Sequence, residues 1–173
     1  NAPLESVMGP MQSRWKRKGW GIRIGGTGGD ILCNLRFADD VILLASSRRQ
    51  LKLMLEDVVT ECGRVGLELH MGKSKVLCNA EAGAGTTKHF LHVGRHSIEV
   101  LTQEDSTMYL GRLLSFTSWA DVEINHRIQQ GWKKFYSLKK ELCNKSFHIK
   151  HRLRLFQSTV VPTVLYSSGT WSM

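Results

Sequence analysis

Cysteine, acidic residues and long apolar runs are all scarce in this sequence. The four cysteines lie far apart and form no C-x-x-C pair, so neither a zinc site nor a secreted disulfide framework is indicated. No apolar run reaches the roughly 18 residues that a membrane span needs, and no signal-peptide pattern opens the chain. We therefore expect an intracellular protein, in the cytoplasm or the nucleus, with no membrane partner and with buried thiols at Cys33, Cys62 and Cys78.

The deficit of acidic residues leaves a basic chain, in which 24 Lys and Arg stand against 15 Asp and Glu for a net charge of +9. The bases are concentrated in residues 14–23, which hold no acid, and in residues 127–154, where nine bases face Glu141 alone. Residues 30–70 are slightly acidic. Basic arms around an acidic centre suit a metal-dependent enzyme that acts on nucleic acid. A solvated basic helix pair has the same composition, so charge alone leaves both interpretations open.

The 173 residues and the hydrophobic fraction of 42% are sufficient for one domain, or for a domain with a small appendage. The chain begins at Asn1 with neither a methionine nor a leader, and we expect it to be a piece of a longer protein. The apolar runs 31–37 and 41–45, joined by Ala38-Asp39-Asp40, predict a β-hairpin. The glycine cluster at 25–29 predicts a hairpin turn, because it lacks the spacing of a P-loop or a dinucleotide fingerprint.

A helix is predicted over 47–65. Ser47 and Gln50 match a capping box, apolar residues then repeat at helical spacing, and Gly66 can end the helix. Short strands and a glycine-rich loop are expected after it, namely strands at 67–70 and 75–78 around a turn at 71–74, a loop at 80–87, and strands at 90–93, 97–101 and 108–114.

Helical periodicity returns from Ala120. The predicted apolar stripe of this helix consists of Ile124, Ile128, Trp132, Phe135, Leu138 and Leu142. A second helix is expected from Ile149 to just before Pro162. The sequence therefore predicts an α+β fold, with a mixed sheet-and-helix part in residues 1–116 and a helical part in residues 117–173.

Asp39 and Asp40 are the most informative adjacent pair. Two carboxylates at the tip of an apolar hairpin repel each other unless water or cations neutralise them, and hard oxygen ligands of this kind suit Mg²⁺. Because successive strand residues point to opposite faces, we expect Asp39 to face the site and Asp40 to point away or toward a second ion. Asp-Asp is also ordinary turn chemistry, so the dipeptide by itself does not separate a metal site from a plain turn.

Residues 35–45, Leu-Arg-Phe-Ala-Asp-Asp-Val-Ile-Leu-Leu-Ala, resemble the F/Y-x-D-D catalytic hairpin of reverse transcriptases in the form used by non-LTR retrotransposons. Residues 66–75 resemble the next motif of that family, Gly-Leu-x-Leu-Asn-x-x-Lys-Thr, with His70 for the Asn, Ser74 for the Thr and Lys73 retained. Tyr109-Leu110-Gly111 is similar to the primer grip. The basic helices that end in residues 161–166, with Trp171 beyond, are similar to the thumb. The motifs occur in the family's order over nearly the whole chain.

This resemblance implies the C-terminal part of a polymerase palm in residues 1–116, with a catalytic hairpin, a packed helix and short antiparallel strands, and an α-helical thumb in residues 117–173. It implies an RNA-directed DNA polymerase, a nucleotidyltransferase that extends a DNA primer on an RNA template by two-metal phosphoryl transfer. The family's first catalytic aspartate and its Gly-rich template motif would precede Asn1. The chain alone is therefore expected to be inactive.

The resemblance also implies roles for individual residues. Asp39 and Asp40 would be catalytic and hold two Mg²⁺ ions, and Lys73 would act as general acid, with Lys75 as the alternate in the same turn. Tyr109, Leu110 and Gly111 would hold the primer. Nucleic-acid contacts are expected from Lys133, Lys134, Lys139, Lys140, Lys150 and Arg152. The implied partners are an RNA template, a DNA primer, deoxynucleoside triphosphates and the remainder of the retroelement polyprotein.

Two other interpretations stay open at this point: a non-catalytic nucleic-acid-binding relic of a retroelement, and a maturase-like or RNA-dependent polymerase fragment with a similar palm. A zinc site at His89, His92 and His96 is not expected, because their spacing in a strand and turn does not bring the rings together. The Trp132, Phe135 and Tyr136 group is interpreted as thumb core, and Tyr136 at its edge is the residue that could stack on a base.

Overall fold

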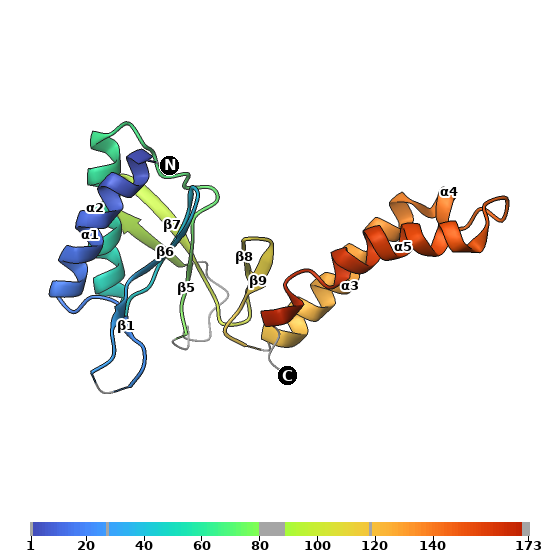
Figure 1. The fold of residues 1–173 in the computed structure, drawn as a ribbon. Helices are drawn as coiled ribbons and strands as arrows, with labels where there is room; N and C mark the ends of the chain where they lie inside the picture. Colours follow the sequence, from blue (N-terminus) through green and yellow to red (C-terminus); the bar gives the residue numbers. More distant parts are fainter. Residues whose placement is uncertain (1, 27, 80–88, 118, 171–173) are drawn as a thin grey trace. The chain divides into compact units, whose positions relative to one another are not determined.

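The computed structural model describes residues 2–26, 28–79, 89–117 and 119–170, and the chain divides into two compact units (Figure 1). The first unit consists of residues 1–78 and 82–101, and the second of residues 79–81 and 102–173. Both helices and small sheets are present, so the structure belongs to the α+β class. The glycine-rich loop expected at 80–87 and Trp171 lie outside the described residues.

The first unit holds, in chain order, α1 (Ala2–Arg17), β1 (Ile22–Arg23), β2 (Ile31–Leu32), β3 (Asn34–Phe37), β4 (Asp40–Leu43), α2 (Arg48–Arg64), β5 (Lys75–Leu77), β6 (His89–Val93) and β7 (His96–Leu101). The second unit holds β8 (Thr107–Tyr109), β9 (Arg112–Leu114), α3 (Trp119–Ser137), α4 (Lys139–Leu142), α5 (Ile149–Val164) and a 3₁₀ turn, η1 (Ser168–Thr170).

Helix α2 is the central element of the first unit, and its predicted start is confirmed. The Ser47 hydroxyl accepts a hydrogen bond from the Gln50 N–H at 3.2 Å, which satisfies a donor at the helix start. Gln50 Oε1 in turn accepts from the Ser46 N–H at 2.9 Å and from the Gly21 N–H at 3.2 Å. Gln50, in the first turn of α2, therefore also fixes the helix to the loop before β1.

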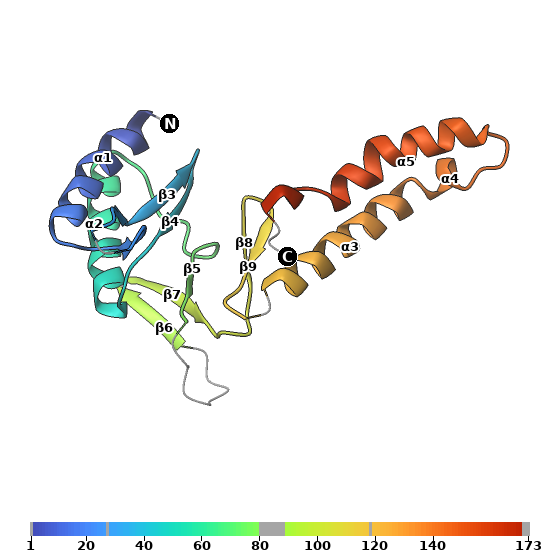
Figure 2. The ribbon, with the colours of Figure 1, turned by 60° about the horizontal axis from the view of Figure 1, so that its bottom comes forward.

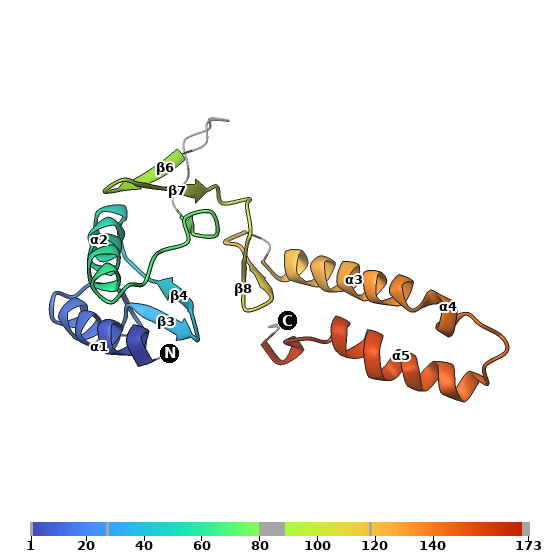
Figure 3. The ribbon, with the colours of Figure 1, turned by 90° about the horizontal axis from the view of Figure 1, so that it is seen from above.

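Two hydrophobic cores lie on opposite sides of α2, as Figure 3 shows for the layers of this unit. The core against α1 is formed by Met8, Met11, Trp15, Cys33, Met54, Val58 and Cys62. The core against the β5–β7–β6 sheet is formed by Leu55, Val76, Leu91, Val93 and Ile98. Cys33 and Cys62 are thus buried thiols, as the sequence predicts.

Helix α1 was not predicted from the sequence, where only the basic charge of residues 14–23 was noted for this segment. Its apolar residues Met8, Met11 and Trp15 repeat at three- and four-residue steps and are fully or almost fully buried. The Trp15 indole N–H donates to Asp57 Oδ2 at 2.8 Å, and Arg14 pairs with the same carboxylate at 3.1 Å. This polar contact between α1 and α2 lies at the edge of the core.

The two predicted hairpins at the start of the chain are both present. Strands β1 and β2 pair antiparallel across the glycine cluster, and β3 and β4 pair antiparallel with Phe37 opposite Asp40. The run expected over 31–37 is interrupted at Cys33, so its first residues pair with β1 and its last with β4. The turn of the second hairpin is therefore Ala38-Asp39, and Asp40 already belongs to a strand.

The strand expected at 67–70 is wrong. Helix α2 ends in a Schellman motif, in which the Leu67 N–H donates to Cys62 O at 3.0 Å and the Gly66 N–H donates to Gly63 O at 3.2 Å. Gly66 has φ +74°, which the motif requires. The following residues have no strand pairing, and Leu67 and Leu69 pack on the core instead. Strand β5 therefore pairs with β7, in parallel, rather than with a strand before the turn.

The second unit consists of the β8–β9 hairpin and the antiparallel helices α3 and α5 (Figure 2). The strand expected over 108–114 is a hairpin. Helix α5 continues past Pro162 to Val164, so its expected end is also wrong. In its last turn the Leu165 N–H donates to Val161 O at 2.9 Å, and Thr163 Oγ1 donates to Thr159 O at 2.8 Å.

Among the described residues, no helix has the length and apolar character of a membrane span.

The division between the units falls after Leu101, earlier than the boundary expected at residue 116. The reason is that β8–β9 is bonded to α3: Glu123 Oε2 accepts from the Leu113 N–H at 2.9 Å. The hairpin therefore belongs with the helices. The assignment of the two units to palm and thumb stays a prediction.

Candidate functional site

The β3–β4 hairpin presents Asp39 and Asp40 at its tip, and both are exposed. Asp39 lies in the turn, beside Ala38 with φ +53°, and Asp40 is the first residue of β4. Since residues directly opposite each other share a face, Asp40 lies on the same face as Phe37. The alternation expected for two strand residues does not apply to this pair, because only one of them is in a strand.

The two faces of this hairpin differ. Its inner face is held by the protein, because Arg36 pairs with Glu5 of α1 at 2.9 Å and Val41 packs on the core. Its outer face carries Leu35 and Phe37, whose side chains are 44% and 64% exposed. The tip and the outer face are thus accessible on a hairpin whose other face is anchored.

The carboxylates of Asp39 and Asp40 fit part of a magnesium site. Mg²⁺ in phosphoryl-transfer sites commonly takes one or two carboxylates and completes its shell with waters and substrate phosphates. Within the described part of the chain, no group of three or more His, Cys, Asp and Glu side chains could hold a metal ion.

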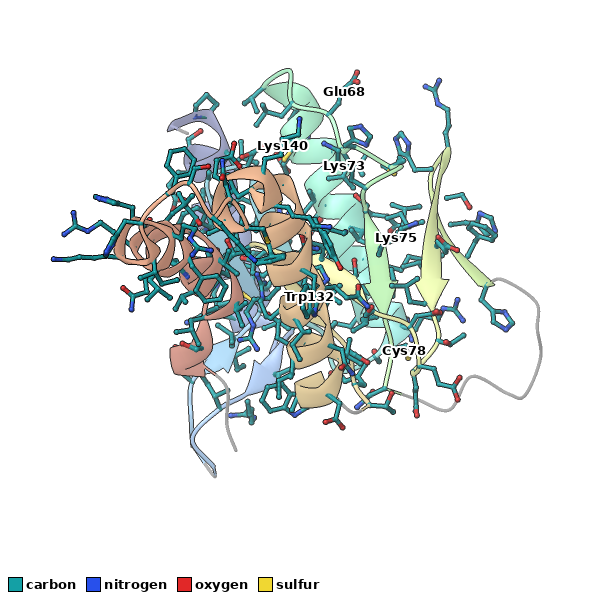
Figure 4. The ribbon with its side chains drawn as sticks, turned by 90° about the vertical axis from the view of Figure 1, so that its right-hand side faces the viewer. Glu68, Lys73, Lys75, Cys78, Trp132 and Lys140 are labelled. Carbon is teal, nitrogen blue, oxygen red and sulfur yellow. The ribbon has the colours of Figure 1, made fainter. Side chains whose placement is uncertain are left out.

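Lys73 and Lys75, the two lysines expected as candidates for a general acid, have different surroundings (Figure 4). The Lys75 ammonium pairs with Glu99, its register partner on β7, at 2.5 Å. Lys73 is exposed in the turn before β5, and its ammonium makes no ion pair or hydrogen bond with the described residues. The turn is closed by His70 O, which accepts from the Lys73 N–H at 3.1 Å and from Ser74 Oγ at 3.0 Å. Lys73 is therefore the lysine left available for a ligand.

Tyr109, Leu110 and Gly111 form the tip of the β8–β9 hairpin. Leu110 and Gly111 have φ values of +48° and +76°, the signature of a type I′ turn. The Tyr166 hydroxyl donates to Leu110 O at 3.0 Å, and Arg127 donates to Gly111 O. The turn backbone is thus held by Arg127 of α3 and by Tyr166, which follows α5.

Glu123 and Arg127 are the buried polar pair behind this turn, and the sequence analysis missed both. Arg127 Nε donates to Glu123 Oε1 at 2.6 Å, and its guanidinium lies 4.7 Å from the Tyr166 ring centroid. Burial alone raises the pKa of the Glu123 carboxyl, but the Leu113 N–H and Arg127 outweigh it and hold that pKa below its ordinary value. The i, i+4 Glu–Arg spacing on the predicted helix was the available signal.

The predicted buried stripe of α3 is largely on the surface of the structure. Ile128 and Trp132 are 45% and 55% exposed, whereas Glu123, Arg127 and Gly131 are buried. Helix α5 packs against the face of α3 that carries the buried residues Glu123, Arg127 and Gly131. This close packing requires glycine at 131, because a Cβ there would collide with Val164. The interpretation of Trp132 as thumb core is therefore wrong for the described residues.

The expected nucleic-acid-binding bases fall into two groups. The exposed lysines are Lys133, Lys134, Lys139, Lys140 and Lys150. Arg152 is half-buried and donates to Leu142 O at 3.3 Å, at the end of α4. The lysines can reach phosphates, but Arg152 holds α4 to α5.

The sequence is 34% identical over 142 residues to a transposon-derived protein of Caenorhabditis elegans. The match covers 82% of this chain and 49% of the relative, so the chain spans about half the length of that protein. No protein-family model matches the chain, and no solved structure gives a significant match. The chain has a transposon-derived homologue.

Proposed function

We propose that the chain is the C-terminal palm and thumb portion of an RNA-directed DNA polymerase of a non-LTR retroelement. The observation that carries the proposal is the β3–β4 hairpin, whose tip presents Asp39 and Asp40 to solvent while its inner face is anchored to α1. The transposon-derived relative supports the same origin. The proposed ligands are an RNA template, a DNA primer and deoxynucleoside triphosphates.

Each part of the chain has a proposed role. Asp39 and Asp40 would hold Mg²⁺ together with the substrate phosphates, and the ions would supply charge stabilisation for phosphoryl transfer. The Lys73 ammonium would donate a proton to the leaving pyrophosphate oxygen. The Leu110–Gly111 backbone would contact the primer, and the exposed lysines of α3, α4 and α5 would bind phosphates.

A non-catalytic nucleic-acid-binding relic is the second candidate. The carboxylate count is compatible with it, because Asp39 and Asp40 have no third acidic partner among the described residues. The enzyme would need the family's first aspartate from the sequence upstream of Asn1. The basic helices would bind nucleic acid equally well in either case. The two candidates therefore differ in turnover and not in binding.

The test is primer extension on an RNA template with Mg²⁺. The 173-residue chain alone should give no extension, because the first aspartate of the family is absent from it. A longer chain, encoded with the in-frame sequence upstream of Asn1, should extend the primer. In that chain Asp39→Asn should abolish extension, Asp40→Asn should reduce it less, and Asp121→Asn, an exposed acid on α3, serves as the matched control.

The relic predicts another pattern. Stop codons upstream of Asn1, or a longer chain that binds the RNA–DNA hybrid but never extends it, would favour the relic over the enzyme. Equal activity of the Asp39→Asn and Asp121→Asn chains would show that the carboxylate hairpin is not the site.

A further inference from the structure

Two aromatic rings lie exposed side by side on α3. Trp132 and Tyr136 are 55% and 61% exposed, and their ring centroids are 5.9 Å apart with the planes tilted by 32°. Phe135 meets both edge-on, at 5.8 Å from each centroid. Because Phe135 supports the two rings at their edges, Trp132 and Tyr136 keep ring surface that faces water.

Lysines border these rings. Lys139 Nζ lies 5.8 Å from the Tyr136 ring centroid. A shallow hollow continues from the ring and is lined by Tyr136, Lys139, Lys140, Cys143 and Asn144. Figure 4 shows Trp132 on α3 and Lys140 on α4, the helix that follows it. The surface therefore combines aromatic faces with cations one helical turn away.

This combination indicates which ligand the surface suits. Residues 127–154 carry nine bases and one acid, so a second copy of this face would be repelled and a polyanion attracted. Among polyanions, single-stranded nucleic acid is bound through aromatic rings that stack on bases and cations that follow the backbone. A closed duplex offers phosphates to the lysines but no free base faces to the rings.

We propose that Trp132 and Tyr136 form a stacking site for unpaired nucleotide bases, and that Lys139 and Lys140 bind the adjoining phosphates. The inference rests on the proposed nucleic-acid-binding function and adds a ligand class, single-stranded nucleic acid, to this part of the chain. It also accounts for the exposure of Trp132, which the sequence predicts to be core, and it assigns base stacking to Trp132 as well as to Tyr136, the edge residue that the sequence left open for this role.

The experiment compares two single strands of equal charge by fluorescence anisotropy, using the 173-residue chain. One is oligothymidine of roughly 12 nucleotides, and the other has the same length with abasic residues. Since the phosphates are identical, the difference in affinity measures base stacking. The parent chain should bind the base-bearing strand about fivefold to tenfold tighter.

The variants locate that preference. Tyr136→Leu and Trp132→Leu should each remove most of it, because leucine keeps the apolar bulk without the ring, whereas Tyr136→Phe should retain it. Phe116→Leu, an exposed phenyl outside the site, is the matched control. Lys139→Ala and Lys140→Ala should each weaken binding of the base-bearing strand and of the abasic strand by the same factor. Circular dichroism should show the same helix content in all variants, because the mutated side chains are exposed.

The alkylation rate of Cys143 is an independent measure of ligand binding in the hollow. Its thiol is exposed, whereas Cys33 and Cys62 are buried, and burial raises the pKa of both buried thiols and slows their alkylation. Oligothymidine should slow the reaction of Cys143 with iodoacetamide several-fold more than the abasic strand does. The half-buried Cys78, in another part of the chain, should react at an unchanged rate.

A blunt RNA–DNA hybrid separates this inference from the proposed function. Salt-dependent hybrid binding with no base preference would overturn the stacking site and leave the proposed function intact. A base preference without hybrid binding would support the site and count against the proposed function. If Tyr136→Leu keeps the preference, or if the rings bind anionic vesicles and not bases, the stacking site is refuted.

Discussion

The Tyr166 hydroxyl, just after α5, donates to the carbonyl oxygen of Leu110 at 3.0 Å, across 56 residues of sequence. With the bond from Arg127 to Gly111 O, it fixes both residues of the type I′ turn at the tip of β8–β9. The turn that resembles a primer grip is therefore held by α3, through Arg127, and by Tyr166, which follows α5. A backbone segment held in this way is suited to contact a ligand without first being ordered.

Tyr166→Phe should loosen this turn. The substitution removes one hydrogen bond and keeps the ring that contacts Arg127, so the free energy of unfolding should fall by about 0.5–1.5 kcal/mol. Amide hydrogen exchange at Leu110 and Gly111 should become faster. The matched control is Tyr136→Phe, whose hydroxyl makes no hydrogen bond with the described residues and whose stability should not change. Equal effects of the two variants would contradict the role assigned to Tyr166.

Glu123 should make the second unit sensitive to acid. Burial raises the pKa of this carboxyl, but its bonds to the Leu113 N–H and Arg127 lower that pKa by more than burial raises it. The folded pKa therefore lies below the ordinary value of 4.5. The stabilisation is then fully present above pH 4.5 and is lost as the pH falls through the lower, folded pKa. Hydrogen exchange of α3 across a pH series should show this loss.

Glu123→Gln should remove this pH dependence and, at neutral pH, destabilise the second unit by roughly 3 kcal/mol, because Arg127 stays buried without its anion. Asp121→Asn, on the exposed side of the same helix, should change stability by less than about 0.5 kcal/mol. An unchanged acid transition in Glu123→Gln would show that another carboxyl is responsible.

Two local elements of the first unit, helix α2 and the β3–β4 hairpin, were predictable from neighbouring residues. Ser47 and Gly66 mark the two ends of α2, and the acidic pair marks the β3–β4 tip. The pairing partners were not predictable in the same way, because they depend on distant residues. Strand β5 pairs with β7 through Lys75 and Glu99, a contact that no local pattern around residues 67–78 encodes.

The face that α3 buries was mispredicted for a physical reason. Apolar periodicity assumes that the most apolar face packs, but helix contact also depends on how closely two backbones can approach. Gly131 allows that approach on one face, and the Glu123–Arg127 pair is satisfied by the hairpin backbone. The apolar face of Ile128 and Trp132 is left exposed.

Changes at Lys73 and at Lys75 should have different effects in a chain extended upstream of Asn1, if that chain has the proposed polymerase activity. Lys73→Ala should lower kcat by about 10²-fold or more if its ammonium is the general acid, and should leave folding unchanged because the side chain is exposed. Lys75→Ala should leave kcat within a few-fold of the parent. It should lower the free energy of unfolding by up to about 1 kcal/mol, through loss of the Glu99 pair. Single-turnover extension and urea unfolding measure the two effects; the reverse assignment would follow if Lys75→Ala lost turnover.

The basic helices should bind nucleic acid through phosphates, without regard to sequence. Lys133 and Lys140 are exposed, and each phosphate contact they make releases counterions, so affinity should fall steeply with salt. Changing both to Ala should weaken binding to all RNA–DNA hybrids about equally and flatten the salt slope by about one unit per lost contact.

Arg152→Ala should leave the salt dependence of nucleic-acid affinity unchanged. It should instead destabilise the connection between α4 and α5, because Arg152 donates to Leu142 O. Fluorescence anisotropy of a labelled hybrid across a salt series distinguishes the two groups of residues. If affinity does not depend on salt, or if the double lysine variant binds like the parent, the basic face is solvated surface and does not bind nucleic acid.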